Sequence, residues 1–445
     1  MTRKLLVRFF IVLFSFLPAI SCLYASSLTV ETDYRVRGVS FSNNDFDVSS
    51  STDARSYYSQ RIGVTIGGSF APGVRIATKL TAIGVAGSTS TLFATPYPNT
   101  TLTPYIENAY VVLTDFNDLP VDIIAGKQPL SYGDGLIIDD NGVGFNAFRI
   151  IGHTSWPIKW DMELVTAKLT DNFRPDADAD LYGGVASTDW KQHHWELGYF
   201  RYINDAGYVY TLPGNITDIT KEVYKQFYDI RVGRRNELSL YQFELAKQTG
   251  YITRSNNTAI ALDGMGYTLR GELYGKNTKL GSVTARAFLA MNTGNDLQNT
   301  GTDNSFSPDL TRRFDGLERA GNGQLFAATP TGGYYTLPSA EYSGINTLSL
   351  GAEFSPLYGW AFSVDYFLYS TSVGPRGAPV ASGFERLFGG EFSIGVEMDL
   401  AVKYTHSKYV TSSLSYNRYT PPKFDQLWPH SDPATRYQYE ITAKF

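Results

Sequence analysis

Cysteine and histidine are scarce in this 445-residue chain, which contains one cysteine, Cys22, and five histidines. One thiol forms no disulfide within the chain and supplies no cysteine-based metal site. With five histidines, the chain has few side chains suited to general acid–base catalysis. No GxSxG, HExxH or phosphate-loop motif occurs. The sequence therefore predicts a protein that is not an enzyme and that uses no cofactor and no metal ion.

Long apolar runs are also missing, because no stretch after residue 25 reaches the about 18 apolar residues of a helical membrane span. A shorter apolar run at residues 9–17 follows basic residues and precedes small ones. This order is typical of a secretory signal peptide, with cleavage after Ser21 or Ala25. We favour Ala25, which makes residues 1–25 the signal peptide and 26–445 the mature protein. Lipidation of Cys22 is the alternative.

The chain lacks a strong excess of either charge, since its formal net charge of −5 is spread along its length. That distribution argues against nucleic acid as a partner, because nucleic-acid-binding proteins carry concentrated basic patches. Aromatic residues are abundant instead, with 31 Tyr, 27 Phe and 6 Trp. Amphipathic aromatics in such numbers suit the interfacial girdles of a membrane barrel.

Apolar and polar residues alternate with a period of two through most of the chain. Clear examples are residues 28–37, 61–66, 74–80, 360–366 and 391–397. Successive side chains of a strand point to opposite faces, so each segment has one apolar and one polar face. A soluble sandwich shows the same pattern, so the connections between the strands have to decide between the two architectures.

Short and long connections take turns along the sequence. The short links are 71–73, 115–120, 151–157, 188–193, 234–236, 275–280, 355–359 and 397–399. The longer polar loops are 40–55, 86–103, 129–142, 169–179, 204–224, 249–259, 293–342, 371–385 and 410–434. Outer-membrane barrels have short periplasmic turns and longer extracellular loops. The sequence thus predicts an all-β fold, a single transmembrane antiparallel β-barrel of about 18 strands with both ends periplasmic.

The last segment, residues 436–445, alternates polar and aromatic residues and ends on Phe445. This looks like the terminal-strand signal by which the barrel assembly machinery recognises outer-membrane barrels. An amphipathic edge strand that ends on an aromatic by chance is the alternative. We expect outer-membrane lipid and, through Phe445, the assembly machinery as partners.

Several segments resemble the alginate export porin family. Residues 106–111 (IENAYV) are similar to its REAYV strand, and residues 126–135 (GKQPLSYGDG) to its GRQ-x-L-x-YGDG segment. Residues 145–150 (FNAFRI) and 291–296 (MNTGND) resemble two further strands. The resemblance implies an 18-stranded barrel that carries polysaccharide or another hydrophilic solute across the outer membrane.

Charges on the polar faces are expected to line the lumen, because a charge facing lipid at mid-depth costs about 2–4 kcal/mol. The basic candidates are Arg35, Arg37, Arg61, Arg75, Lys79, Lys127, Arg149, Arg231, Arg270, Arg286 and Lys403. The acidic candidates are Glu31, Asp33, Asp122, Asp161, Glu163, Glu196, Asp229, Glu244, Glu272, Glu353, Asp365, Glu391 and Glu397. These charges form either a selectivity lining for anionic sugars or a structural ladder of neutralised pairs.

Two loops are candidates for the pore mouth. Loop 293–342 is the longest, and it either folds into the pore as a constriction or remains a surface loop. The loop that contains Tyr132 and Asp134 is expected to turn sharply near the mouth. Asp134 then either contacts a sugar or caps the turn.

The sequence as a whole predicts a porin or export channel in the bacterial outer membrane. Its solutes would be hydrophilic, among them anionic poly- or oligosaccharides such as alginate, and periplasmic export partners would deliver them. The alternative is a barrel with a closed lumen that acts as a receptor or adhesin through its extracellular loops.

Overall fold

The computed structural model describes most of the barrel wall and parts of the loops. The described residues are 27–43, 55–87, 103–139, 144–155, 158–170, 178–205, 209–212, 216–278, 281–295, 301–308, 310–311, 323–326, 343–356, 359–374, 381, 386, 390–422 and 432–445. The expected signal peptide, residues 1–25, lies outside them, as do Arg312, Arg313, Asp315, Glu318 and Arg319 of the longest loop.

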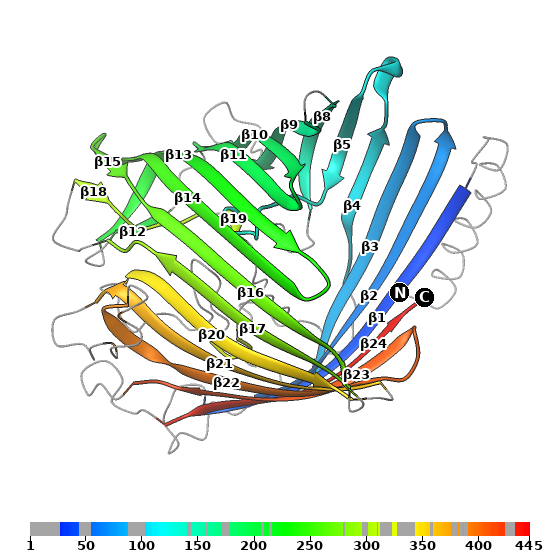
Figure 1. The fold of residues 1–445 in the computed structure, drawn as a ribbon. Helices are drawn as coiled ribbons and strands as arrows, with labels where there is room; N and C mark the ends of the chain where they lie inside the picture. Colours follow the sequence, from blue (N-terminus) through cyan, green and yellow to red (C-terminus); the bar gives the residue numbers. More distant parts are fainter. Residues whose placement is uncertain are drawn as a thin grey trace, which may run out of the picture.

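Eighteen antiparallel strands form a closed barrel, as predicted. They are β1 (Ser27–Ser42), β2 (Arg55–Ala71), β3 (Val74–Gly87), β4 (Thr103–Leu113), β5 (Val121–Gln128), β8 (Phe145–Thr154), β9 (Trp160–Thr170), β10 (Ala179–Trp190), β11 (His193–Asn204), β13 (Ile216–Arg235), β14 (Ser239–Arg254), β16 (Met265–Thr278), β17 (Gly281–Asn292), β20 (Ser343–Ser355), β21 (Trp360–Val373), β22 (Phe392–Thr405), β23 (Val410–Thr420) and β24 (Ala434–Lys444). Strand β24 pairs with β1 along residues 33–42, which brings the two ends of the chain side by side (Figure 1). Closure leaves no unpaired sheet edge in the membrane.

One of the eight predicted short turns is misplaced. The sequence puts a turn at 397–399, but these residues lie in the middle of β22, and the connection to β23 is at 406–409. Glu397 and Asp399 face the lumen, where both are buried, so acidic residues at these positions are compatible with a strand. Acidic residues that mark a turn in a soluble protein mark the inward face in this barrel.

Short strands lie outside the 18-stranded wall. Strands β12 (Val209–Leu212), β15 (Ala259–Leu262) and β18 (Thr302–Asp303) extend it, and β6 (Ser131–Tyr132), β7 (Ile138–Asp139) and β19 (Leu310–Thr311) form a separate small sheet. The 3-10 turn η1 (Phe116–Asp118) connects β4 and β5. Across the described residues, no helix is long and apolar enough to cross a membrane.

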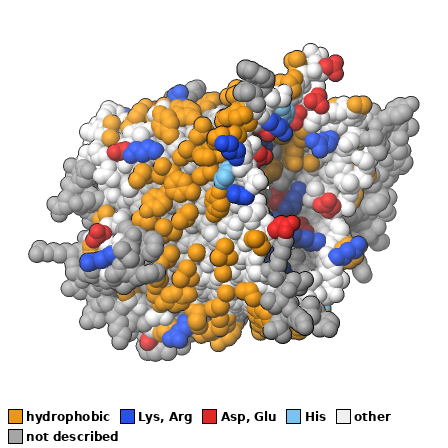
Figure 2. Space-filling view, viewed as in Figure 1, with side chains coloured by type: hydrophobic (Ala, Val, Ile, Leu, Met, Phe, Trp, Pro, Cys, Tyr) orange, Lys and Arg blue, Asp and Glu red, His pale blue; other side chains and the backbone are white. Residues whose placement is uncertain are grey.

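The outward face of the wall is apolar. Large side chains such as Leu164 and Leu273 are 66% and 64% exposed, an arrangement that only a lipid surrounding stabilises. Figure 2 shows hydrophobic side chains spread over the outer wall, while charged side chains gather in the recess. The polar side chains of the alternating pattern therefore point into the barrel.

The inward face changes character along the barrel axis. Toward the ends of the strands that carry the long loops, inward positions are apolar and buried, as at Val39, Phe41, Phe200 and Tyr419. Two clusters of such residues surround residues 130–138 and residues 325–326. The long loops after β5 and β17 therefore each send a segment into the barrel. We call residues 130–139 the first inner segment and residues 323–326 the second inner segment.

Candidate pore

Carboxylates of the barrel wall hold the first inner segment. The Tyr132 hydroxyl donates to Glu163, the Gly133 amide donates to Glu196 Oε1 at 2.9 Å, and the Asp134 amide donates to Glu244. Gly133 and Gly135 adopt φ values of +63° and +75°, which glycine accepts without strain. The YGDG sequence is thus a tight turn that donates to three strands of the wall, with two backbone amides and the Tyr132 hydroxyl.

Tyr132 is the apolar anchor of this turn. Its ring lies 4.9 Å from that of Phe200, centroid to centroid, and its side chain belongs to the larger buried cluster. Burial, with the nearby Glu163 charge, raises the pKa of Tyr132 far above its usual range. The hydroxyl therefore remains a hydrogen-bond donor to Glu163 at any physiological pH.

Glu397 holds the second inner segment by the same chemistry. Its carboxylate accepts the backbone amides of Gln324 and Leu325, each at 2.6 Å, and of Phe326 at 2.9 Å. Glu397 is 0% exposed, and Asp399 accepts the Gln324 amide as well, at 3.0 Å. A buried carboxylate that accepts several amides is a strong, charge-assisted anchor.

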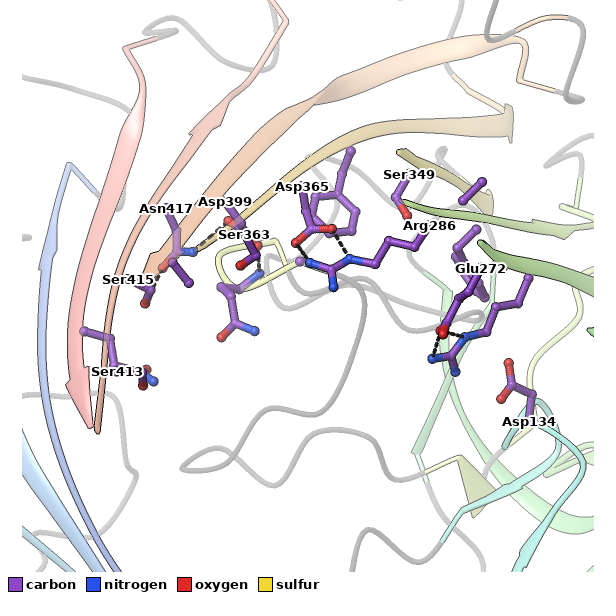
Figure 3. A pocket seen from close by; sticks show the side chains of 18 residues that line it. Asp134, Glu272, Arg286, Ser349, Ser363, Asp365, Asp399, Ser413, Ser415 and Asn417 are labelled. Carbon is purple, nitrogen blue, oxygen red and sulfur yellow. Dashed lines mark hydrogen bonds and ion pairs between the residues drawn. The ribbon is translucent and has the colours of Figure 1, made fainter. Parts of the chain in front are cut away.

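A belt of polar residues follows one level of the wall. Cross-strand neighbours in this belt run from Glu272 through Arg286, Gly351, Asp365 and Asp399 to Asn417. Figure 3 shows these side chains lining one cavity along β16 to β23. The belt therefore borders the second inner segment, whose Gln324 amide Asp399 accepts.

Arg286 is the most tightly held cation of the belt. Its guanidinium donates twice to Asp365, at 2.6 Å for both contacts, and lies 3.8 Å from Glu353. The pair spans β20 because that strand has Gly351 between them, where a Cβ would lie 1.9 Å from Asp365 Oδ1. Beside it, Arg270 donates to Glu272 at 2.7 Å.

Further charge pairs line the remaining wall. Arg37 binds Glu440 at 2.7 Å across the closing β1–β24 seam, and Arg149 binds Glu163 twice, at 2.7 Å. The contacts favour pairwise neutralisation at the seam over a continuous basic lining.

Glu107 concentrates three contacts and is 1% exposed. It accepts from Arg61 at 2.9 Å, from Lys79 at 2.6 Å and from Thr81. The sequence did not single out Glu107, because a register shift at Lys79 interrupts the regular alternation between β3 and β4. No period-two pattern assigns a face reliably across such a bulge.

Replacing Glu107 by glutamine is expected to destabilise the barrel, because it leaves Arg61 and Lys79 without their shared partner. Removing one member of a buried charge cluster costs about 3–5 kcal/mol. The heat-induced mobility shift on SDS gels should therefore occur at a lower temperature. Glu31→Gln is the matched control, since Glu31 is an exposed inward carboxylate near the end of β1. Equal shift temperatures for both variants would contradict this assignment.

The other predicted cations occupy different cavities. Arg35, Arg61 and Lys79 line one of about 500 Å³ near the chain termini, and Arg75 and Arg149 line another of about 500 Å³. Lys403 lines a cavity of about 390 Å³ next to the β22–β23 turn, and Arg231 lines one of about 320 Å³ beside the β13–β14 turn. The predicted cations thus spread around the lumen instead of forming one site.

Two predicted pore-lining residues lie elsewhere. Lys127 pairs with Asn146 and Ala109 on the face opposite to Arg149, so it points outward, and its Nζ donates to the Ile106 carbonyl at 2.7 Å. Glu391 precedes β22 and is exposed at the end of the barrel that carries the long loops. The register of β5 is regular across Gly126, so alternation from the inward Asp122 already places Lys127 on the outward face, and the prediction for Lys127 was wrong.

Comparison with known proteins gives the family. The model of the family described as "Alginate export" matches residues 26–424. The chain belongs to the alginate export family. The comparison with curated proteins found no sequence that matches this chain.

Solved structures agree on the fold. OccAB2 of Acinetobacter baumannii is 11% identical, with a TM-score of 0.54 over 95% of this chain and 99% of its own. OccAB3 of the same species is 11% identical, with a TM-score of 0.53 over 94% and 100%. OccD3 of Pseudomonas aeruginosa is 10% identical, with a TM-score of 0.52 over 95% and 92%. At these identities the likeness concerns the barrel fold alone.

Family and fold together place this member of the alginate export family in the bacterial outer membrane, surrounded by lipid, as a channel for solutes. We call the level of the barrel at which the two inner segments and the polar belt lie the narrow zone, because the inner segments occupy part of the lumen there.

Proposed function

We propose that this protein passes hydrophilic saccharides across the outer membrane, among them anionic chains such as alginate. The observation that carries the proposal is the cavity beside the β22–β23 turn. There Lys403, Lys408 and Lys444 outnumber the single carboxylate, Glu440. Among the described residues, no carboxylate pairs with the Lys403 or Lys444 ammonium.

These lysines stand at the end of the barrel with the short turns, which is the periplasmic end of an outer-membrane barrel. Because their charges are not neutralised, they attract anionic chains from the periplasm and raise the local concentration of solute at the mouth. Periplasmic export partners would present the chain at this end. We further propose that residues 1–25 are a signal peptide and that the barrel assembly machinery recognises Phe445.

A second candidate function is a receptor or adhesin with a closed lumen. It is favoured by the two inner segments, which pack with buried aromatic residues at the end of the barrel that carries the long loops. In that case the long loops would bind a partner and nothing would pass.

Conductance in planar bilayers tests the proposal against this alternative. Refolded full-length protein should give stable single-channel steps, and oligosaccharides added to the periplasmic side should interrupt the current. The absence of steps in several lipid compositions would overturn passage and favour the receptor.

The double variant Lys403→Gln and Lys444→Gln is expected to shift ion permeability toward cations by about twofold or more, since unpaired charges at a pore mouth set local ion concentrations. Reversal potentials in a salt gradient measure this ratio. Lys127→Gln is the matched control, because Lys127 lies on the outward face. An unchanged reversal potential in the double variant would mean that the mouth lysines do not select the solute.

A further inference from the structure

The narrow zone and the periplasmic mouth differ in which polar side-chain groups are available to bind a solute. A cavity of about 480 Å³ lies there between Asp134 of the first inner segment, Gln324 of the second, and the wall from β16 to β24 (Figure 3). Sites for small molecules have volumes of about 300–1,000 Å³. The cavity therefore has the size of a specific site, and its lining belongs to the inward face of the wall and to both inner segments.

The two cations of this cavity are already occupied. Arg286 makes two contacts of 2.6 Å with Asp365, and Arg270 makes contacts of 3.0 and 2.7 Å with Glu272. Each guanidinium directs two of its N–H donors at a wall carboxylate, so that carboxylate offsets the positive charge at short range. An anionic sugar would have to share each guanidinium with the carboxylate that already holds it.

Carboxylates also outnumber cations in this cavity. Its lining includes four acidic residues and two arginines; the acidic residues are Asp134, Glu272, Asp365 and Asp399. Like charges at close range suppress the binding of the wrong partner. The lining therefore offers uronate carboxylates no surplus of positive charge, in contrast to the lysines at the mouth.

Hydroxyl groups are the polar atoms that stay available. Ser349 of β20, Ser363 of β21 and Ser413 of β23 line the cavity, and none of their hydroxyls has a hydrogen-bond partner among the described residues. Each hydroxyl donates one hydrogen bond and accepts others, which matches the hydroxyl groups of a sugar. Phe288 and Phe367 add apolar surface to the same lining.

From these contacts we propose that the narrow zone is a binding subsite for a short uncharged stretch of saccharide chain, whose successive units contact Ser349 beside Phe288, then Ser363, then Ser413. The subsite deepens the saccharide passage proposed above and rests on it for its role. The subsite would recognise neutral sugar chains, or neutral stretches of mixed chains, inside the channel. Anionic chains would be attracted at the mouth and disfavoured at this step.

Calorimetric titration of the folded, detergent-solubilised full-length protein tests the subsite without requiring conduction. The probes are maltohexaose, which is neutral, and a guluronate hexamer, which is anionic. Maltohexaose should bind more tightly, and the double variant S349A and S363A should weaken it about tenfold, since two hydrogen bonds are lost. S412A is the matched control, because Ser412 is next to Ser413 but on the outward face, where it contacts His406 at 3.0 Å.

A second variant reverses the preference. Asp365→Asn removes one carboxylate and frees Arg286, so binding of the guluronate hexamer should become at least several-fold tighter. The subsite is overturned if maltohexaose affinity is the same in wild type and in S349A and S363A. It is equally overturned if wild type binds the guluronate hexamer more tightly and Arg286→Gln abolishes that binding. Titration that behaves as expected in a protein without conductance would leave the subsite standing and refute passage.

Discussion

Replacing Glu397 by alanine is expected to raise the single-channel conductance several-fold. Glu397 accepts the amides of Gln324, Leu325 and Phe326 and is fully buried, while Asp399 shares the Gln324 amide. Each buried amide that loses its acceptor costs about 1–3 kcal/mol, so the second inner segment no longer gains by staying in the lumen. Once it leaves, the narrow zone widens, and planar-bilayer recordings should show larger steps.

Two further variants make this result interpretable. Glu397→Gln keeps one accepting oxygen, so its conductance should lie between those of wild type and Glu397→Ala. Glu353→Ala removes the same charge from the lumen, but Glu353 contacts Arg286 and no inner segment among the described residues. Its conductance should stay near the wild-type value. Wild-type conductance in Glu397→Ala would show that the anchor does not hold the segment in place.

Replacing Gly133 by valine is expected to expel the first inner segment and to lower the thermal stability of the barrel. Gly133 has a φ of +63°, and a Cβ there would lie 2.3 Å from Glu244 Oε1. A β-branched residue fits neither the backbone conformation nor the space. The segment therefore gives up its hydrogen bonds to Glu196 and Glu244 together with its packing around Tyr132.

Hydrogen exchange reports this change directly. The amides of Gly133 and Asp134 should exchange slowly in wild type and much faster in Gly133→Val, with conductance rising in parallel. Gly271→Ala is the control, because nothing lies within 4 Å of a Cβ placed at Gly271. If both amides remain protected in Gly133→Val, the wall carboxylates do not determine the position of the turn.

Carboxylates of the wall hold both inner segments, which explains why both predictions have large effects. In each case the wall presents carboxylates, and the segment donates to them from backbone amides and, at Tyr132, from a hydroxyl. Glu163, Glu196 and Glu244 come from β9, β11 and β14, and Glu397 comes from β22. Because opposite regions of the wall hold the two segments, releasing one should leave the other in place.

Local alternation was sufficient to predict the barrel. Period-two patterns identified the strands, since a strand between lipid and a polar lumen has to alternate. The lengths of the connections gave the strand number and seven of the eight short turns. The pattern failed at Glu107, where a register shift disturbs the alternation, and at 397–399, where inward carboxylates resemble a turn. The prediction for Lys127 was wrong although the alternation is regular there.

The sequence by itself thus determined the architecture, the membrane and the inward direction of most charges, because those depend on neighbours along one strand. Only the tertiary structure decided which charges are neutralised and where the lumen narrows. Asp134 meets Glu244 across 110 residues, and Gln324 meets Glu397 across 73. Contacts of that separation depend on closure of the barrel, which brings distant strands face to face, and no local pattern encodes them.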